Sequence, residues 1–260
     1  MSEPNPYQPP APVSAPVKPA PVSDGPVSPR AVDAGRGWDW IVEGFDLFKK
    51  APGNWILNIV IFVVCAVVIG VIPMIGTLAN MLLTQIFMGG LMLGCRALDE
   101  GGKLEIEHLF AGFSNRAGDL VVHGVLTLVG WIVAFVPAFL IVGGGTFMSM
   151  IMSGGPGFHL GAMGLTFLLG MLVAMALALP LYMALWFAPA LIVLNGLKPV
   201  DAMKASFSGC LKNIVPFLVY GVVMLVLCFV AAIPFGLGFL VLGPVAIGSM
   251  YKGYRDIFAA

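Results

Sequence analysis

The sequence predicts an all-α fold: a polytopic transmembrane helical bundle of six spans, arranged as three hairpins that are each preceded by an amphipathic interfacial helix. A disordered, Pro-rich N-terminal tail precedes this domain. The first observation is composition, since 59% of the 260 residues are hydrophobic and only 10% are charged, whereas a soluble domain carries about 25% charged residues. The second is that charged residues are absent from three long stretches, at residues 51–95, 120–197 and 213–251.

Each uncharged stretch is long enough for two crossings, because a hydrocarbon core of about 30 Å needs roughly 20 helical residues. Pro and Gly, which end helices and reverse the chain, interrupt the stretches at residues 72–76, 143–145, 154–157 and 233–236. The predicted spans are about 54–72, 77–97, 119–142, 161–182, 214–233 and 238–256, within a membrane domain of residues 36–258. A β-barrel would show alternating strands, but residues 59–64 are apolar on every side.

The positions of the basic residues predict the orientation. All 13 Lys and Arg residues lie before the first uncharged stretch, between stretches, or after the last one, and the hairpin turns carry none. With an even number of crossings, both termini and both linkers share one face of the membrane. The positive-inside rule places that face in the cytoplasm.

Residues 1–35 form the predicted tail. Ten of the twenty prolines lie in residues 1–30, so we expect a disordered cytoplasmic segment with polyproline II character. It lacks the apolar region of a signal peptide. Two interpretations stay open: a solvated tail, or a docking site for a cytoplasmic partner that recognises Pro-rich sequence.

Three segments before the hairpins have the periodicity of an amphipathic helix, at residues 38–50, 104–115 and 199–211. Such a helix next to a span favours the membrane surface, where its apolar face enters the headgroup region. Aromatic residues, Trp above all, are enriched at this interface. The predicted interfacial anchors are Trp38, Trp40, Phe45, Phe48 and Trp186.

The three segments also align with one another and predict a threefold internal repeat. Phe45, Phe110 and Phe207 take equivalent places, and a proline follows them after 28, 27 and 27 residues. Each unit would consist of a surface helix, a span, a Pro-marked end and a returning span. Because all units enter from the same side, they are parallel, unlike the inverted repeats of many transporters.

The second unit departs from this pattern. Its connection, residues 143–160, is longer than the others, and its returning apolar stretch covers residues 161–194. As one helix this stretch would measure roughly 51 Å, well beyond the hydrocarbon core. Pro180 and Pro189 are expected to kink it or to divide it into a span and an interfacial segment.

Polar side chains inside the predicted spans are few. Ionisable residues within a membrane mark ion paths and substrate sites, and no Asp, Glu, Lys or Arg lies in the core of a predicted span. The side chains that would line a polar pocket are Asn80, Thr84, Gln85 and His123. Such groups also join helices through hydrogen bonds, so both interpretations stay open.

No pattern for catalysis, a cofactor or a metal stands out. The four cysteines lack the spacing of a metal site, and the Gly clusters lack the Lys-Ser/Thr of a phosphate loop. We therefore expect a protein that is not an enzyme and binds no cofactor. The net charge of zero also excludes nucleic-acid binding through a strongly basic domain.

Several stretches resemble a family of uncharacterised proteobacterial inner-membrane proteins: residues 35–44, 93–99, 109–113, 184–191 and 251–258. More loosely, residues 186–213 are similar to the membrane domain found beside glycerophosphodiester phosphodiesterases. The catalytic residues of those enzymes belong to a separate soluble domain. The resemblance therefore implies a location in the bacterial inner membrane and a helical membrane fold, and it brings no active site.

Together these patterns predict an integral, multi-pass inner-membrane protein that acts as a structural, scaffolding or envelope-related component. The alternative is a small transporter or lipid-handling protein, with its pocket near the four polar residues of the spans. The expected partners are membrane lipids, further copies of the chain in a homo-oligomer, and a cytoplasmic protein that binds the tail; nucleic acid is not among them.

Overall fold

The computed structural model describes residues 27–152 and 160–259, and every regular element in these ranges is a helix. The helices are α1 (Arg36–Lys50), α2 (Pro52–Gly70), α3 (Ile75–Asp99), α4 (Glu107–Ser114), α5 (Ala117–Met152), α6 (Leu160–Trp186), α7 (Ala188–Asn195), α8 (Pro199–Lys212), α9 (Ile214–Ala232) and α10 (Phe239–Phe258). The predicted all-helical fold class is confirmed.

Five helical segments of the described chain are long and apolar enough to cross a membrane: Pro52–Gly70, Ile75–Asp99, Ala117–Met148, Gly164–Asn195 and Ile214–Ala232. The predicted sixth span corresponds to α10, whose last turns carry Lys252, Arg255 and Asp256. These charges leave residues 239–251 uncharged, which is about 20 Å of helix. The crossing by α10 therefore stays a prediction.

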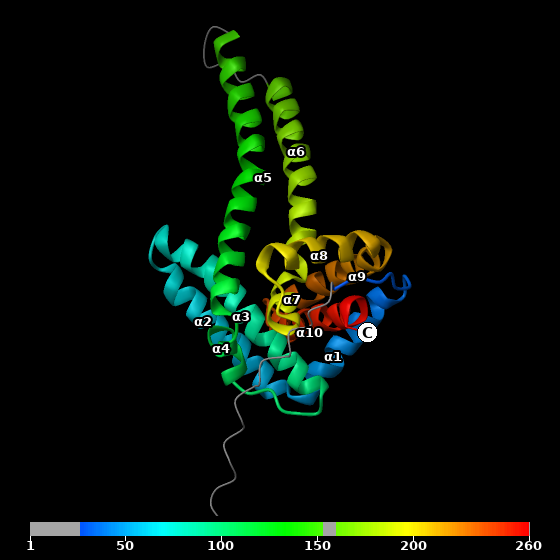
Figure 1. Cartoon of the computed structure of the whole chain (residues 1–260). Coiled ribbons are helices and arrows are strands. Elements are labelled where there is room, and N and C mark those ends of the chain that lie inside the picture. Colours follow the sequence, from blue (N-terminus) through cyan, green and yellow to red (C-terminus); the bar gives the residue numbers. More distant parts are fainter. Residues whose placement is uncertain (1–26, 153–159, 260) are drawn as a thin grey trace, which may run out of the picture.

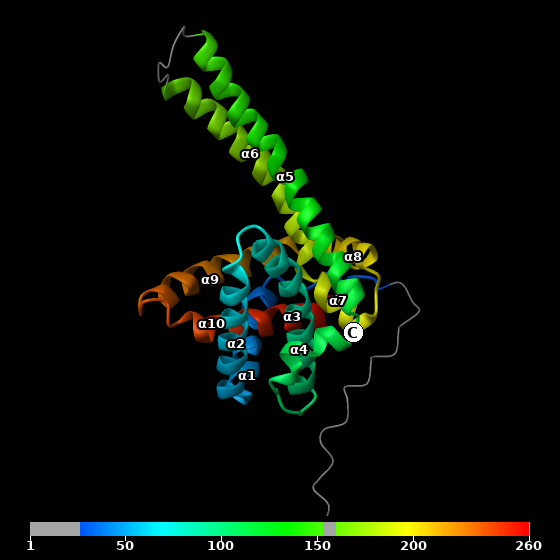
Figure 2. The ribbon, with the colours of Figure 1, turned by 90° about the vertical axis from the view of Figure 1, so that its left-hand side faces the viewer.

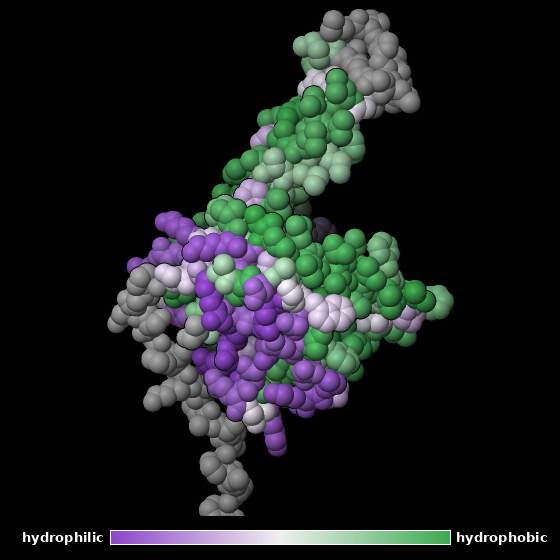
Figure 3. Space-filling view, turned by 90° about the vertical axis from the view of Figure 1, so that its right-hand side faces the viewer, coloured by the Kyte–Doolittle hydropathy of each residue, from purple (hydrophilic) through white to green (hydrophobic). Residues whose placement is uncertain are grey.

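The long helices form three hairpins that are packed together at a shared base and diverge toward their tips (Figures 1 and 2). The hairpins pair α2 with α3, α5 with α6, and α9 with α10, and the α5–α6 hairpin projects farthest. In Figure 3 the hydrophilic surface gathers at one end of the base, whereas apolar surface covers the projecting helices. The predicted bundle is thus open, with one charged end.

The short helices α1, α4 and α8 each connect two neighbouring hairpins. Each packs mainly on the returning helix of the preceding hairpin: α4 on α3, α8 on α6, and α1 on α10. The equivalent positions of the three short helices, Gly44, Leu109 and Ser206, are all buried. This equivalence agrees with the predicted threefold repeat. Because α1 packs on the last helix of the chain, the three units close into a ring.

Backbones approach closely where α1 crosses α10. A Cβ atom on Gly44 would lie 2.6 Å from both the backbone nitrogen of Ser249 and the carbonyl oxygen of Val245. A Cβ on Gly248 would lie 3.0 Å from Cα of Gly44. Contact at this separation is open only to residues without a side chain, so glycine at these positions sets the distance between α1 and α10.

The third predicted span ends later than its glycines indicate. The prediction that Gly143–Gly145 marks a turn is wrong, because α5 continues as one helix to Met152. A helix in lipid keeps its own backbone hydrogen bonds, and glycine there permits close packing. A Cβ on Gly145 would lie 2.2 Å from Cγ2 of Thr166 in α6. The other predicted turn, at residues 154–157, lies outside the described residues.

The long returning stretch is divided, but not by Pro180, which lies within α6. The break falls at Phe187, with Pro189 in the first turn of α7. The hydroxyl of Ser206 in α8 accepts a hydrogen bond from the backbone N–H of Phe187 (3.0 Å) and donates one to the carbonyl of Met183 (2.7 Å). Residues 188–194 of α7 are buried in the base, where α7 packs on α3 and α8. Its location at the membrane interface stays a prediction.

The predicted tail is partly ordered. Residues 1–26 lie outside the described residues, but residues 27–35 lie against α8 and α10. The side chain of Asn213 accepts a hydrogen bond from the N–H of Val32 (2.8 Å) and donates one to the carbonyl of Arg30 (2.9 Å). The N–H of Arg30 also donates to the carbonyl of Ile257 (3.0 Å). This segment therefore links the C-terminal end of α8 to the C-terminal end of α10.

We expect Gly44→Ala to destabilise the protein by about 1 to 3 kcal/mol, because the added methyl group overpacks the α1–α10 contact. The measurement is thermal unfolding of the purified protein in detergent. Gly143→Ala is the matched control, since a Cβ there meets no atom within 4 Å and alanine improves helix propensity. Equal melting temperatures for the two variants would contradict the close contact.

Candidate functional site

The predicted pocket residues Asn80 and Thr84 make hydrogen bonds that join or stay within helices. The side-chain nitrogen of Asn80 donates to the carbonyl of Ala66 in α2 (2.8 Å). The hydroxyl of Thr84 donates to the carbonyl of Asn80 one turn earlier (2.7 Å). Asn80 thereby ties α3 to α2 near the tip of the first hairpin.

Gln85 and His123 lie at other contacts. A Cβ added to Gly124 of α5 would lie 3.6 Å from Cγ of Gln85, so Gln85 is directed to α5 while Asn80 is directed to α2. His123 is fully buried, and neither ring nitrogen has a hydrogen-bond partner among the described residues. Asn80 and Gln85 are thus directed to two different neighbours of α3. The polar pocket itself stays a prediction.

The predicted interfacial anchors fall into two groups. Trp38 and Phe45 are 53% and 42% exposed, as expected for an interfacial face of α1. Trp40 and Phe48 are buried inside the protein, so they do not have the exposure predicted for interfacial anchors. The glycines of α1 let this helix pack closely against α9 and α10, which covers both side chains. Trp186 is partly buried and packs on other aromatic rings.

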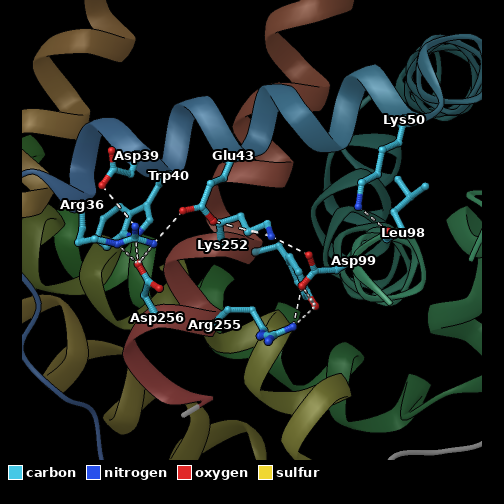
Figure 4. A network of polar contacts seen from close by, with 11 residues as sticks. Arg36, Asp39, Trp40, Glu43, Lys50, Leu98, Asp99, Lys252, Arg255 and Asp256 are labelled. Carbon is cyan, nitrogen blue, oxygen red and sulfur yellow. Dashed lines mark hydrogen bonds and ion pairs between the residues drawn. The ribbon is translucent and has the colours of Figure 1, made fainter. Parts of the chain in front are cut away.

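A network of charged side chains lies at the hydrophilic end of the base, where α1, α3 and α10 meet (Figure 4). Asp99 at the end of α3 accepts from Nζ of Lys252 and from Nη1 of Arg255, both at 2.6 Å. The side chains of Asp99 and Lys252 are 15% and 18% exposed. This partly buried ion pair joins the first hairpin to the third.

A second cluster in the network joins α1 to α10. Nε of Arg36 donates to Asp256 at 2.6 Å, and Nη2 of Arg36 donates to Glu43 at 2.9 Å. The indole N–H of Trp40 also donates to Asp256, at 2.7 Å. Burial opposes the charge of Arg36, but its hydrogen bond to Asp256 and the two carboxylates outweigh burial and raise the pKa of the guanidinium.

Lys252 connects the two clusters, because its Nζ also lies 3.7 Å from Glu43. Each charged side chain of the network is thereby close to one of opposite charge. The network can therefore hold α1, α3 and α10 together. From the sequence, Asp99, Lys252, Arg255 and Asp256 are expected at helix ends. Their pairing was missed, because α1, α3 and α10 are far apart in the chain and only the ring closure brings them together.

An apolar crevice with a volume of about 690 Å³ opens between α6 and α9, over α8. Its lining is apolar and aromatic, and it comprises Leu179, Tyr182, Met183, Trp186, Cys210, Leu211, Ile214, Phe217, Leu218, Tyr220, Gly221, Met224 and Ala246. Aromatic rings close the end nearest the base, with ring centroids of Trp186 and Phe217 at 6.0 Å and of Trp186 and Tyr220 at 5.9 Å. None of the predicted pocket residues lines it.

We expect Asp99→Asn to destabilise the protein by roughly 2 to 3 kcal/mol, because it leaves Lys252 and Arg255 without their carboxylate in a partly buried site. Asp46→Asn is the control: Asp46 pairs with Lys49 at 2.7 Å, but both side chains are more than half exposed, and such a pair contributes at most about 1 kcal/mol. Thermal unfolding in detergent measures both, and equal losses would contradict the structural role of the network.

No family model and no solved structure matches the chain. The chain is 30% identical over 212 residues to a protein of Burkholderia thailandensis described as a probable inner membrane protein. The match covers 79% of this chain and 77% of that protein, so it includes most of the helical domain and not an isolated motif. The chain therefore belongs to the family of this inner-membrane protein.

Proposed function

We propose that the protein is a non-catalytic structural or scaffolding component of the bacterial inner membrane. The observation that carries the proposal is the separation of charge from the hairpins. The charged side chains of the network are paired with one another at one end of the base, and the uncharged hairpins expose large apolar side chains along their length. Such faces suit contact with lipid.

The proposal includes six crossings, with both termini in the cytoplasm. Its support is the pairing of Asp99 at the end of α3 with Lys252 and Arg255 in α10. Helix ends joined by ion pairs lie at the same level, so α10 returns to the side on which α3 ends. The basic residues at this end agree with a cytoplasmic face.

Three kinds of partner belong to the proposal. Membrane lipids contact the exposed apolar faces, and further copies of the chain would pack against the same faces in a homo-oligomer. A cytoplasmic protein would bind the Pro-rich tail, which the ordered residues 27–35 anchor at the charged end of the base. Each of these three partners is one that a scaffolding protein of the membrane would bind.

The topology is tested with alkaline phosphatase and green fluorescent protein fusions at Gly102, at Gly236 and after Ala259. We expect cytoplasmic signals at Gly102 and Ala259 and a periplasmic signal at Gly236, which lies in the turn between α9 and α10. A periplasmic signal after Ala259 would show that α10 does not cross. A reversal at all three sites would overturn the orientation.

The alternative function, a small transporter or lipid-handling protein, is favoured by one observation: the ring nitrogens of His123 have no hydrogen-bond partner within residues 27–152 and 160–259. Under the scaffold proposal, we expect His123→Leu to keep or raise the melting temperature, because it removes buried polar atoms that lack partners. Thr127→Val, one turn away, is the control; its hydroxyl donates to the carbonyl of His123 at 2.9 Å. A folded His123→Leu protein that alters solute uptake or lipid composition would favour the alternative.

A further inference from the structure

The crevice between α6 and α9 has no part in the scaffold proposal. The other neighbouring hairpins pack closely, α3 on α5 and α10 on α2, whereas α6 and α9 meet through the aromatic rings of Trp186, Phe217 and Tyr220. A crevice this size falls in the range of small-molecule sites, about 300 to 1,000 Å³. The crevice is therefore large enough to bind a ligand.

The side chains of the lining indicate an apolar occupant. Most of them are aliphatic or aromatic, with Leu179, Phe217 and Leu218 among them. The thiol of Cys210 donates to the carbonyl of Met183 within the protein (3.5 Å).

The length of the crevice matches one leaflet of the bilayer. Its wall on α9 runs from Ile214 to Met224, which is about 15 Å of helix. A hydrocarbon core is about 30 Å thick, so this wall spans about half of it. The wall begins at the start of α9, next to the charged end of the base, so the crevice belongs to the leaflet on that side.

A membrane offers two apolar occupants, a lipid acyl chain and a helix of a second copy. A helix with its side chains is a stiff cylinder about 10 Å wide. An acyl chain is thinner and flexible, so it can follow an irregular groove between two helices, and lipid is always present beside the crevice.

We propose that the crevice between α6 and α9 is a binding site for one acyl chain of a phospholipid in the leaflet nearest the charged end. This inference goes beyond the scaffold role and does not need it. Shape and van der Waals contact hold the chain, since lipid tails and apolar side chains offer no hydrophobic difference. Trp186 and its aromatic neighbours close the end of the crevice nearest the base.

The test uses the full chain in vesicles of phosphatidylethanolamine and phosphatidylglycerol that contain a trace of a phosphatidylethanolamine with a diazirine in one acyl chain. After irradiation, mass spectrometry maps the adducts on α9. We expect at least threefold more adduct at Leu218 and Gly221, which line the crevice, than at Val222 and Val226, which are about as exposed as Leu218 but do not line it. Equal labelling at the two pairs would overturn the proposal.

A filling variant makes the test specific. A Cβ on Gly221 meets no atom within 4 Å, so Gly221→Phe places a ring in the crevice, and we expect it to lower crevice adducts at least threefold. Gly143→Phe, on an equally open site of α5, should leave them unchanged. If Gly221→Phe melts early, Gly221→Leu takes its place. Unchanged adducts in a folded filling variant, or a protein–protein adduct through the crevice, would overturn the proposal.

Discussion

The contact between α1 and α10 is the interaction on which the rest of the fold depends. Two glycines, Gly44 and Gly248, bring the backbones together, and only this approach places Arg36 and Trp40 against Asp256. Without it the chain would be a row of three hairpins with free ends. With it the units form a ring, and the base gains a buried centre formed by α7 and its neighbours.

Ring closure also explains how a membrane protein keeps so many charges near its core. Asp99, Lys252 and Glu43 come from three different helices, and each lies within ion-pair distance of at least one of the others. Charges removed from water need such partners. The hairpins beyond this end carry no charge, so their outer faces are left to lipid, and the α6–α9 crevice is a gap in the same apolar surface.

Much of the fold could be predicted from the sequence, because membrane helices are specified by composition over long windows. The helices, the short segments before each hairpin and the repeat follow from local patterns. The burial of Trp40 and the pairing of Asp99 do not, since they depend on contacts between distant segments. The prediction of a turn at Gly143–Gly145 failed because glycine is common both in turns and at close contacts between membrane helices. The looser resemblance of residues 186–213 to the membrane domain beside glycerophosphodiester phosphodiesterases stays a prediction.

The ring has a consequence for biosynthesis. About 200 residues separate Gly44 from its contacts in α10, and at a translation rate of about 5 to 20 residues per second α1 waits roughly 10 to 40 s for its partner. During this time the face of α1 that packs on α10, with Trp40 and Gly44, lacks its neighbour. The contact that closes the ring can therefore form only after both earlier hairpins and α10 have been synthesised.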